Sequence, residues 1–374
     1  MKSSQVENSR SILEKDTIVN QLLTIASQLE TEGKLGEAIP YCRAVLELDR
    51  HNVTAGKQLA KLHETGGNKF RRQHQWSNAI SAYTKALEFD CELGYKLYLE
   101  LMHAQHQLGE IDAANRSYEQ WLKLRFLINS KYNIVYSPIE KNACSLFKNI
   151  LVNHSESGED YRKSKIAVHR YINANKDKFF AQEFSSLCSS KNFKFVILRN
   201  PLDRLVSAYI DKFVRSPKPN RHSISVINRV YKSLGENPDQ NQSITFRQFV
   251  TFLTDKEDRL LDPHWRPQYI YLGLGLLEFD FIGQFENLTP AIKALEEKLN
   301  THIETEVAPA HRINYGNFDK DKKYCDTYPK DLRKLNSFPN SSSMYTPDIE
   351  EMVRKKYAKD IEIYEQVFDT KVEI

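Results

Sequence analysis

The pattern of hydrophobic and polar positions divides the chain into two parts. Up to about residue 125, small and large apolar residues recur every three to four positions, which predicts amphipathic α-helices. From about residue 131, short runs rich in Val, Ile, Phe and Tyr alternate with helical patterns. We therefore predict an all-α domain over residues 17–125, followed by an α/β domain over residues 130–370.

Three stretches of the first domain can be aligned with one another. They are GEAIPYCRAVLELD (36–49), SNAISAYTKALEFD (77–90) and DAANRSYEQWLKLR (112–125). Each has a small residue followed four positions later by a larger one, at Ala38 and Cys42, Ala79 and Tyr83, and Ala114 and Tyr118. This pattern resembles the tetratricopeptide family, whose period is near 34 residues. The resemblance implies stacked helical hairpins with a groove for a peptide or protein partner, and an ordinary helical bundle is the alternative.

The second domain alternates predicted strands with predicted helices. Strands are expected at KYNIVYS (131–137), KIAVH (165–169), FKFVILR (193–199) and FDFIGQFE (279–286). Helices are expected at 145–154, 201–214, 245–254, 287–300 and 346–368. Strands that are separated by helices predict a parallel sheet covered on both faces. Ligands of such sheets bind at the carboxyl ends of the strands.

The composition is that of a globular protein, with 40% hydrophobic and 11% aromatic residues. The sequence contains no apolar run of about 18 residues and no secretory signal pattern, so we expect a cytoplasmic protein without a transmembrane segment. The five cysteines are scattered and lack C-x-x-C spacing. Neither a disulfide framework nor a zinc site is therefore predicted.

Positive charge is concentrated in residues 141–232. This stretch contains 18 Lys and Arg against 7 Asp and Glu, a balance of +11, whereas the whole chain carries +4. A basic cleft of this kind raises the local concentration of an anionic ligand, although a solvated lysine-rich surface is the alternative. A nucleic acid is a poor candidate for the ligand because no nucleic-acid-binding module is evident.

The loop PIEKNACS (138–145) joins a predicted strand to a predicted helix and is a candidate phosphate site. The free N–H groups and the dipole at a helix start stabilise an anion. The small Ala143 and Cys144 let the backbone approach a phosphate, while Lys141 and Ser145 supply an ammonium and a hydroxyl. The loop is not a Walker A sequence, which disfavours a nucleotide or sugar kinase. A chance turn is the alternative.

Arg199 ends a strand of nearly continuous apolar residues. A charge in that position is costly unless it has an anionic partner. Ser207 lies two helical turns further on and can face the same cleft. These two residues therefore form a second candidate anion site, unless Arg199 pairs with Asp203 or Asp211.

Together, these segments resemble the sulfotransferase family, specifically the carbohydrate sulfotransferases that include the chondroitin and dermatan enzymes. EKNACSLFKNIL (140–151) is similar to the family's 5′-phosphosulfate loop, and ILRNPLDRLVSAYIDKF (197–213) to its 3′-phosphate segment. The motifs ITFRQFVTFL (244–253), DPHWRPQ (262–268) and FDFIGQFENL (279–288) follow in the family's order. The resemblance covers about residues 130–370 and implies the sulfotransferase fold, a P-loop-like parallel sheet flanked by helices.

The resemblance implies that the sulfuryl donor is 3′-phosphoadenosine 5′-phosphosulfate (PAPS) and that no metal is required. It also implies transfer to an acceptor hydroxyl, which family analogy places on a carbohydrate. The implied donor-binding residues are Lys141, Asn142, Ala143, Cys144 and Ser145 on the 5′ side, with Arg199 and Ser207 on the 3′-phosphate. Lys141 is also a predicted catalytic residue, because it can balance the charge that develops on the leaving oxygen.

A base must accept the proton of the acceptor hydroxyl. His169, at the end of the predicted strand 165–169, lies at the carboxyl edge of the sheet and matches a histidine of related enzymes. It is the predicted catalytic base, and His154 and Glu183 are the alternatives.

Other positions leave questions open. Glu140 replaces the proline that the family has before the loop lysine, and its carboxylate would weaken phosphosulfate binding unless it points away. Arg204 is expected on the outer side of its helix, with a phosphate contact as the alternative. His264 and Trp265 match the family without an evident role. The polar stretch 215–243 is expected to form a loop over the cleft that selects the acceptor.

A non-catalytic protein is the alternative to an enzyme. In that case the repeats bind a partner, and the second domain is a degenerate nucleotide-binding domain. The acceptor itself cannot be identified from the sequence.

Overall fold

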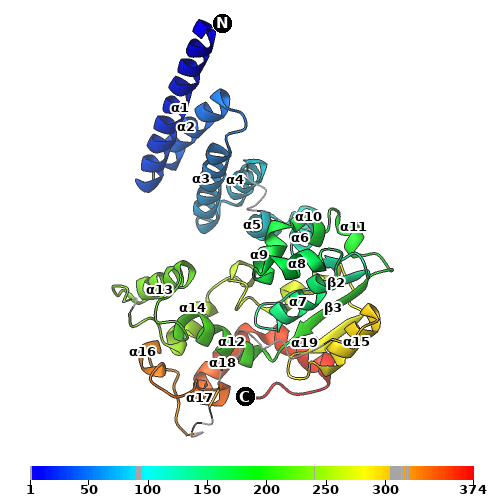
Figure 1. Cartoon of the computed structure of the whole chain (residues 1–374). Helices are drawn as coiled ribbons and strands as arrows, with labels where there is room; N and C mark the ends of the chain where they lie inside the picture. The colour runs from blue at the N-terminus through cyan, green and yellow to red at the C-terminus, as the bar shows by residue number, and fades with distance from the viewer. Residues whose placement is uncertain are drawn as a thin grey trace. The chain divides into compact units, whose positions relative to one another are not determined.

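A computed structural model of the chain describes residues 2–89, 94–239, 241–303, 313, 315, 316, 318 and 321–374 (Figure 1). The chain divides into two compact units, Met1–Leu124 and Arg125–Ile374. None of the described helices combines the length and the hydropathy that are needed to cross a lipid bilayer.

The described residues of the first unit form helices, each packed against the next along the chain. They are α1 (Lys2–Thr31), α2 (Leu35–Leu48), α3 (Val53–Arg72), α4 (Trp76–Phe89), α5 (Gly94–Gln107) and α6 (Ile111–Lys123). The three aligned stretches lie on α2, α4 and α6, except that Asp90 falls outside the described residues. All six of their aligned small and large positions are buried. The apolar periodicity of this part of the chain is therefore that of helices that pack on their neighbours.

The second unit is built on a four-stranded sheet in the order β1-β2-β3-β4. The strands are β1 (Leu127–Asn129), β2 (Ile134–Ser137), β3 (Phe193–Leu198) and β4 (Phe281–Gln284). β1 is antiparallel to β2, whereas β2, β3 and β4 are parallel, with Ser137 opposite Val196 and Leu198 opposite Gln284. The predicted α/β class is confirmed, and the carboxyl ends of three strands meet at one edge of the sheet.

Both faces of the sheet are covered. On one face, the Tyr136 and Phe195 rings stack with their centroids 4.7 Å apart. This face packs against α7 (Cys144–Asn153), α9 (Val168–Ala174) and α15 (Thr289–Leu299). On the opposite face, the Ser137 hydroxyl donates to the carbonyl of Tyr271 in η4 (Gln268–Tyr271) at 2.9 Å. Alternate side chains of the strands are thus buried on opposite sides, as parallel sheets require.

The second unit contains further helices, some of which lie in predicted helical segments, whereas others were not predicted. They are α8 (Gly158–Ser164), α10 (Lys176–Phe179), α11 (Phe184–Leu187), α12 (Pro201–Tyr209), the π-helix η2 (Ile210–Val214), α13 (Arg221–Leu234), α14 (Phe246–Thr254), η3 (Asp258–Leu260), η5 (Gly273–Gly275), α16 (Pro329–Leu332), α17 (Ser341–Met344), α18 (Pro347–Lys356) and α19 (Ala358–Phe368). The helix predicted over 201–214 is therefore α12 followed by one π-helical turn. The helix predicted over 346–368 is two helices, α18 and α19, which meet at Tyr357.

The strand predicted at KIAVH (165–169) is wrong. Lys165 has a left-handed backbone, with φ of +54°, and ends α8. The apolar residues that follow, Val168, Tyr171 and Ile172, are buried at helical spacing on α9. His169 therefore lies in the first turn of a helix and not at the end of a strand.

The loop predicted over 215–243 is also wrong in part, because it contains helix α13. The helix begins after Asn220, whose side chain accepts a hydrogen bond from the Ser223 amide at 2.9 Å. It ends at Gly235, which has φ of +74°. Val226, Ile227, Val230 and Tyr231 form its buried apolar face. The segment was predicted to be a loop because it is mostly polar and its apolar face is narrow.

Candidate functional site

The loop between β2 and α7 presents backbone amides at the carboxyl edge of the sheet. Lys141 and Ala143 have left-handed backbones, with φ of +73° and +56°. Non-glycine residues adopt this conformation at a cost of about 1–2 kcal/mol each, and such strain collects at functional sites. Over the described ranges of the chain, the amides of Ala143, Cys144 and Ser145 meet no hydrogen-bond acceptor. These three N–H groups at the start of α7 are therefore available to an anion.

The structure brings Arg199 next to this loop. Arg199 follows β3, and its Nη1 donates to the carbonyl of Lys141 at 2.9 Å. The guanidinium lies over the Phe285 ring, 4.2 Å from its centroid. Its Nε is buried and has no hydrogen-bond partner among the described residues. A buried guanidinium N–H of this kind favours an anionic ligand, because an unpaired buried donor is costly.

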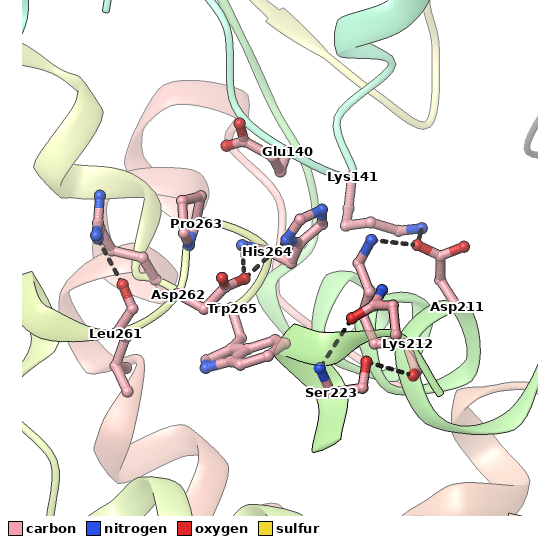
Figure 2. A network of polar contacts seen from close by, with 12 residues as sticks. Glu140, Lys141, Asp211, Lys212, Ser223, Leu261, Asp262, Pro263, His264 and Trp265 are labelled. Atoms are coloured by element: carbon pink, nitrogen blue, oxygen red, sulfur yellow. Dashed lines mark hydrogen bonds and ion pairs between the residues drawn. The ribbon is translucent and has the colours of Figure 1, made fainter. Parts of the chain in front are cut away.

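The Lys141 side chain is almost fully buried, with 11% of it exposed. Its Nζ lies 3.4 Å from Oδ2 of Asp211, which is on the π-helical turn η2 (Figure 2). Asp211 also pairs with Lys212 and Arg215. Burial lowers the pKa of Lys141 to about 8, and the Asp211 carboxylate counters part of this effect. The ammonium therefore lies in a basic environment that suits an additional negative charge.

Glu140 points toward another basic residue. One of its carboxylate oxygens lies 2.5 Å from Nη2 of Arg125. Burial alone would raise the pKa of Glu140, but the adjacent Arg125 lowers it to about 2. Its negative charge is therefore neutralised by Arg125. The carboxylate at the position where the family has proline is thus paired with Arg125, as binding of a phosphosulfate nearby requires.

Asn142 and Gln268 connect the loop to the end of β3. The Asn142 side chain is buried and donates to the carbonyl of Ile197 at 2.8 Å and to Oε1 of Gln268 at 2.5 Å. The Gln268 side chain accepts from the Arg199 amide at 3.0 Å and donates to the Arg199 carbonyl at 2.8 Å. The Asn142 amide donates to the carbonyl of Ile139 at 3.2 Å. Asn142 thus fixes the loop from within, while Gln268 holds the two anion-binding segments together.

Asp360 holds Gln268 in turn. This buried carboxylate, on α19, accepts from the amides of Gln268 at 2.7 Å and Tyr269 at 2.9 Å. Burial raises the pKa of Asp360 to about 6, although both amides act in the opposite direction. Neither Gln268 nor Asp360 is predicted from the sequence as a site residue, even though Gln268 is the last residue of the DPHWRPQ motif.

Arg204 is buried, so its expected place on the outer side of its helix is wrong. Its Nε donates to the carbonyl of Glu140 at 3.0 Å, while Nη1 and Nη2 donate to those of Arg266 at 2.8 Å and Pro263 at 3.0 Å. With these three carbonyls, the guanidinium joins the loop before α7 to the segment that carries His264. Its role is to hold these two backbone segments together. Because three backbone carbonyls satisfy its donors, the guanidinium can be buried, and Arg204 is 1% exposed.

Ser207 is buried on α12, two turns after Arg199 as expected. The phenol of Tyr315 lies beside both Ser207 and Arg199. Tyr315 belongs to a segment without a recognisable motif, so nothing in the sequence indicated it. The predicted pair thus shares one environment, with an aromatic hydroxyl as its neighbour.

His169 lies beside the first turn of α7. Its Nε2 is 3.0 Å from Oγ of Ser145, and its Nδ1 is 3.4 Å from Nζ of Lys148. The alternative His154 lies beyond the other end of α7, a distance of about 15 Å for ten residues. The alternative Glu183 is exposed just before α11. Of these three residues, His169 is the one that the structure places at the loop.

The segment after η3 carries His264 and Trp265. Oδ1 of Asp262 accepts from the His264 amide at 2.9 Å and lies 2.7 Å from Nδ1 of the same residue (Figure 2). Trp265 is buried against Phe213 and Phe249, with ring centroids 5.9 Å and 5.2 Å apart. Trp265 therefore has a packing role, whereas His264 is held by a carboxylate and is partly exposed.

Residues 124–368 match the model of the sulfotransferase family, and this match covers more than half of the chain. The chain therefore belongs to the sulfotransferase family, and the family resemblance of its motifs is confirmed.

Three relatives are carbohydrate sulfotransferases. The chain is 27% identical over 195 residues to carbohydrate sulfotransferase 14 of Homo sapiens, covering 50% of this chain and 47% of that protein. It is 29% identical over 209 residues to carbohydrate sulfotransferase 9 of Homo sapiens, covering 54% and 45%. It is 25% identical over 213 residues to carbohydrate sulfotransferase 12 of Xenopus laevis, covering 50% and 51%. The chain spans about half the length of the curated relatives it matches.

Proposed function

We propose that this protein transfers the sulfuryl group of PAPS to a hydroxyl group of a carbohydrate. The observation that carries the proposal is the 2.9 Å hydrogen bond from Arg199 to the Lys141 carbonyl. It joins two cationic segments from separate strand ends, beside three amides that meet no acceptor within the described part of the chain. Membership of the sulfotransferase family supports the donor, and the names of the relatives support a carbohydrate acceptor. The sequence resemblance favours an acceptor of the chondroitin or dermatan type.

The residues at this edge of the sheet fit such a donor. Lys141, the hydroxyl of Ser145 and the amides of residues 143–145 would bind the 5′ side, while Arg199 and Ser207 would bind the 3′-phosphate. The unpaired Nε of Arg199 and the unpaired amides are donors without protein acceptors over the described ranges. The donor supplies an activated sulfuryl group. Lys141 neutralises the charge that develops on the 5′-phosphate oxygen as its bond to sulfur breaks.

The proposal is tested with purified protein that comprises residues 1–374. Adenosine 3′,5′-bisphosphate, the product nucleotide, is titrated by calorimetry, and transfer is measured from ³⁵S-labelled PAPS to desulfated chondroitin and dermatan. We expect binding and incorporation of label into polysaccharide. Absence of binding at millimolar nucleotide would refute the proposal. Binding without transfer to any acceptor would favour a non-catalytic nucleotide-binding protein.

Nucleotide affinity should fall as the pH rises through about 8, because Lys141 then loses the charge that the phosphate needs. The dissociation constant should increase by up to about tenfold per pH unit above this value. The Lys141→Arg variant, whose guanidinium stays charged, should have a flatter profile. Calorimetry between pH 7 and about 9.5 measures both, and a wild-type affinity that is constant over this range would contradict the role of Lys141.

The same pKa has an opposite effect on stability. The unfolded chain keeps the lysine proton up to a pH near 10.5, the ordinary pKa of lysine, whereas folded Lys141 loses it near pH 8. Stability therefore rises with pH between these values, and the buried charge costs stability below them. An increase of stability with pH is expected for a site in which a buried charge serves ligand binding at a cost in stability.

The first unit is proposed to be a tetratricopeptide-like module that binds a protein or peptide partner. Its support is the burial of the aligned small and large positions on α2, α4 and α6. A cytoplasmic location stays a prediction from the sequence.

A further inference from the structure

The sulfuryl acceptor must lose a proton, and two histidines lie at the loop where this happens. Each can be judged by the hydrogen bonds that its two ring nitrogens make. A general base must offer a nitrogen lone pair to the acceptor hydroxyl, so a ring whose nitrogens are both engaged is unsuited to the task.

The ring nitrogens of His169 are both close to protein groups. The Lys148 ammonium has hydrogens but no lone pair, so at 3.4 Å it can only donate to Nδ1. A neutral His169 then carries its hydrogen on Nε2 and donates it to Oγ of Ser145 at 3.0 Å. The lone pair of the His169 ring is thus engaged by Lys148, and the hydrogen of the ring is engaged by Ser145. This arrangement orients the Ser145 hydroxyl for the donor.

His264 has the opposite arrangement. The Asp262 carboxylate, which can only accept, lies 2.7 Å from Nδ1 and also accepts the His264 amide at 2.9 Å. The hydrogen of the neutral ring is therefore on Nδ1, and the lone pair is on Nε2. Throughout the part of the chain that is described, Nε2 makes no hydrogen bond, and 28% of the side chain is exposed. A carboxylate that fixes the tautomer of a histidine base is a recurrent catalytic arrangement.

The position of His264 is fixed from both sides. Arg204 binds the carbonyls of Pro263 and Arg266, which flank the histidine, and also that of Glu140 in the loop. Tyr357 donates to the carbonyl of Trp265 at 2.5 Å. Figure 2 shows the imidazole pointing toward the loop that carries Glu140 and Lys141, and its charge when protonated acts on Glu140. The base is thus held beside the residue that neutralises the leaving oxygen.

We propose that Nε2 of His264, oriented by Asp262, accepts the proton of the sulfuryl acceptor, and this rests on the proposed function. The acceptor oxygen forms a bond to sulfur as its proton moves to Nε2. The bond between sulfur and the 5′-phosphate oxygen breaks, and its electron pair stays on that oxygen, beside Lys141. The resulting imidazolium is stabilised by Asp262, and it returns its proton to water.

The groups that face His264 can be named. Asp262 comes from its own segment, and Glu140 and Lys141 come from the loop before α7, with Glu140 neutralised by Arg125. Asp211 and Lys212 of η2 lie beyond Lys141 in Figure 2 and pair with each other at 3.1 Å. A substitution of His264 leaves all these groups in place. A change that it causes in the pH profile of the rate is therefore due to the loss of His264.

The test compares His264→Asn with His169→Asn and His154→Asn. Asparagine can still donate to Asp262 from the position of Nδ1 but offers no base. We expect His264→Asn to bind adenosine 3′,5′-bisphosphate as the wild type does, while kcat for transfer to desulfated chondroitin falls about 10²- to 10⁴-fold. The decrease of the wild-type rate toward acidic pH should disappear in this variant. His169→Asn should instead raise the KM for PAPS, and His154→Asn should leave both constants unchanged.

The tautomer of His264 can be measured by NMR without a sulfuryl acceptor. In ¹⁵N-histidine-labelled protein, long-range ¹H–¹⁵N spectra should show His264 with its hydrogen on Nδ1, and Asp262→Asn should remove this preference. A hydrogen on Nε2 of His264, or full kcat and an unchanged acidic limb in His264→Asn, would overturn the inference. Loss of that limb in His169→Asn would transfer the role to His169. Failure of the wild type to bind the nucleotide would refute the proposed function instead.

Discussion

Replacing Arg199 with alanine should weaken the binding of adenosine 3′,5′-bisphosphate by about 10²- to 10⁴-fold, because two charge-assisted hydrogen bonds to the 3′-phosphate are lost. Each such bond contributes about 1.5–3 kcal/mol. The Arg199 Nε is a buried donor without a hydrogen-bond partner among the residues that the structure describes, so its pairing with the 3′-phosphate is gained in full on binding. The variant also loses the hydrogen bond to the Lys141 carbonyl, so the loop before α7 loosens. Calorimetry with the nucleotide measures the effect.

Two further variants give the controls for Arg199. Arg199→Lys keeps the charge but not the planar fork, so its affinity should lie between those of the wild type and the alanine variant. Arg170→Ala removes an exposed arginine of the same basic stretch and should leave affinity unchanged. If a folded Arg199→Ala protein binds as tightly as the wild type, the 3′-phosphate is bound elsewhere.

Replacing Arg204 with alanine should lower the free energy of unfolding of the second unit by about 3–5 kcal/mol. The side chain is 1% exposed, and its removal leaves three backbone carbonyls without their donor. Urea unfolding of the full chain measures the effect. The relevant transition is the one that adenosine 3′,5′-bisphosphate shifts to higher urea, since a ligand stabilises the unit that binds it.

Arg162→Ala is the matched control for this loss of stability. Arg162 also donates to a backbone carbonyl, that of Asn153 at 2.9 Å, but it is exposed and makes a single such bond. Its replacement should change the free energy of unfolding by no more than about 0.5 kcal/mol. Equal effects of the two substitutions would show that Arg204 does not hold the two segments together.

The elements that the sequence predicted correctly are those with a strong local pattern. Strand β3 is apolar except for Lys194 and ends at Leu198, directly before Arg199, and α7 begins at Cys144, the second of the small residues of the loop. The strand predicted at 165–169 failed because five residues with three apolar positions suit a strand and a helix start equally well. Only Tyr171 and Ile172, beyond this segment, reveal the helical spacing.

The residues that the sequence did not reveal act over long separations along the chain. Gln268 contacts Asn142 across 126 positions, and Asp360 contacts Gln268 across 92. Arg204 was placed on the wrong side of its helix for the same reason, because its three carbonyl partners are 59 to 64 positions away. Local periodicity carries no information about such contacts, which arise only when the strand ends meet.

The arrangement of charges around Asp211 determines how the resting protein can receive its ligand. Asp211 is shared by Lys141, Lys212 and Arg215, at 3.4, 3.1 and 3.7 Å. When Lys141 turns to an incoming phosphosulfate, the other two cations remain with the aspartate. Lys141 can therefore exchange Asp211 for the phosphosulfate while Asp211 stays paired with Lys212 and Arg215. Neither the ammonium of Lys141 nor the carboxylate of Asp211 is left without an opposite charge during this exchange. Lys212→Leu would leave Arg215 as the one remaining cation of this pair beside the aspartate and should slow the association of the nucleotide.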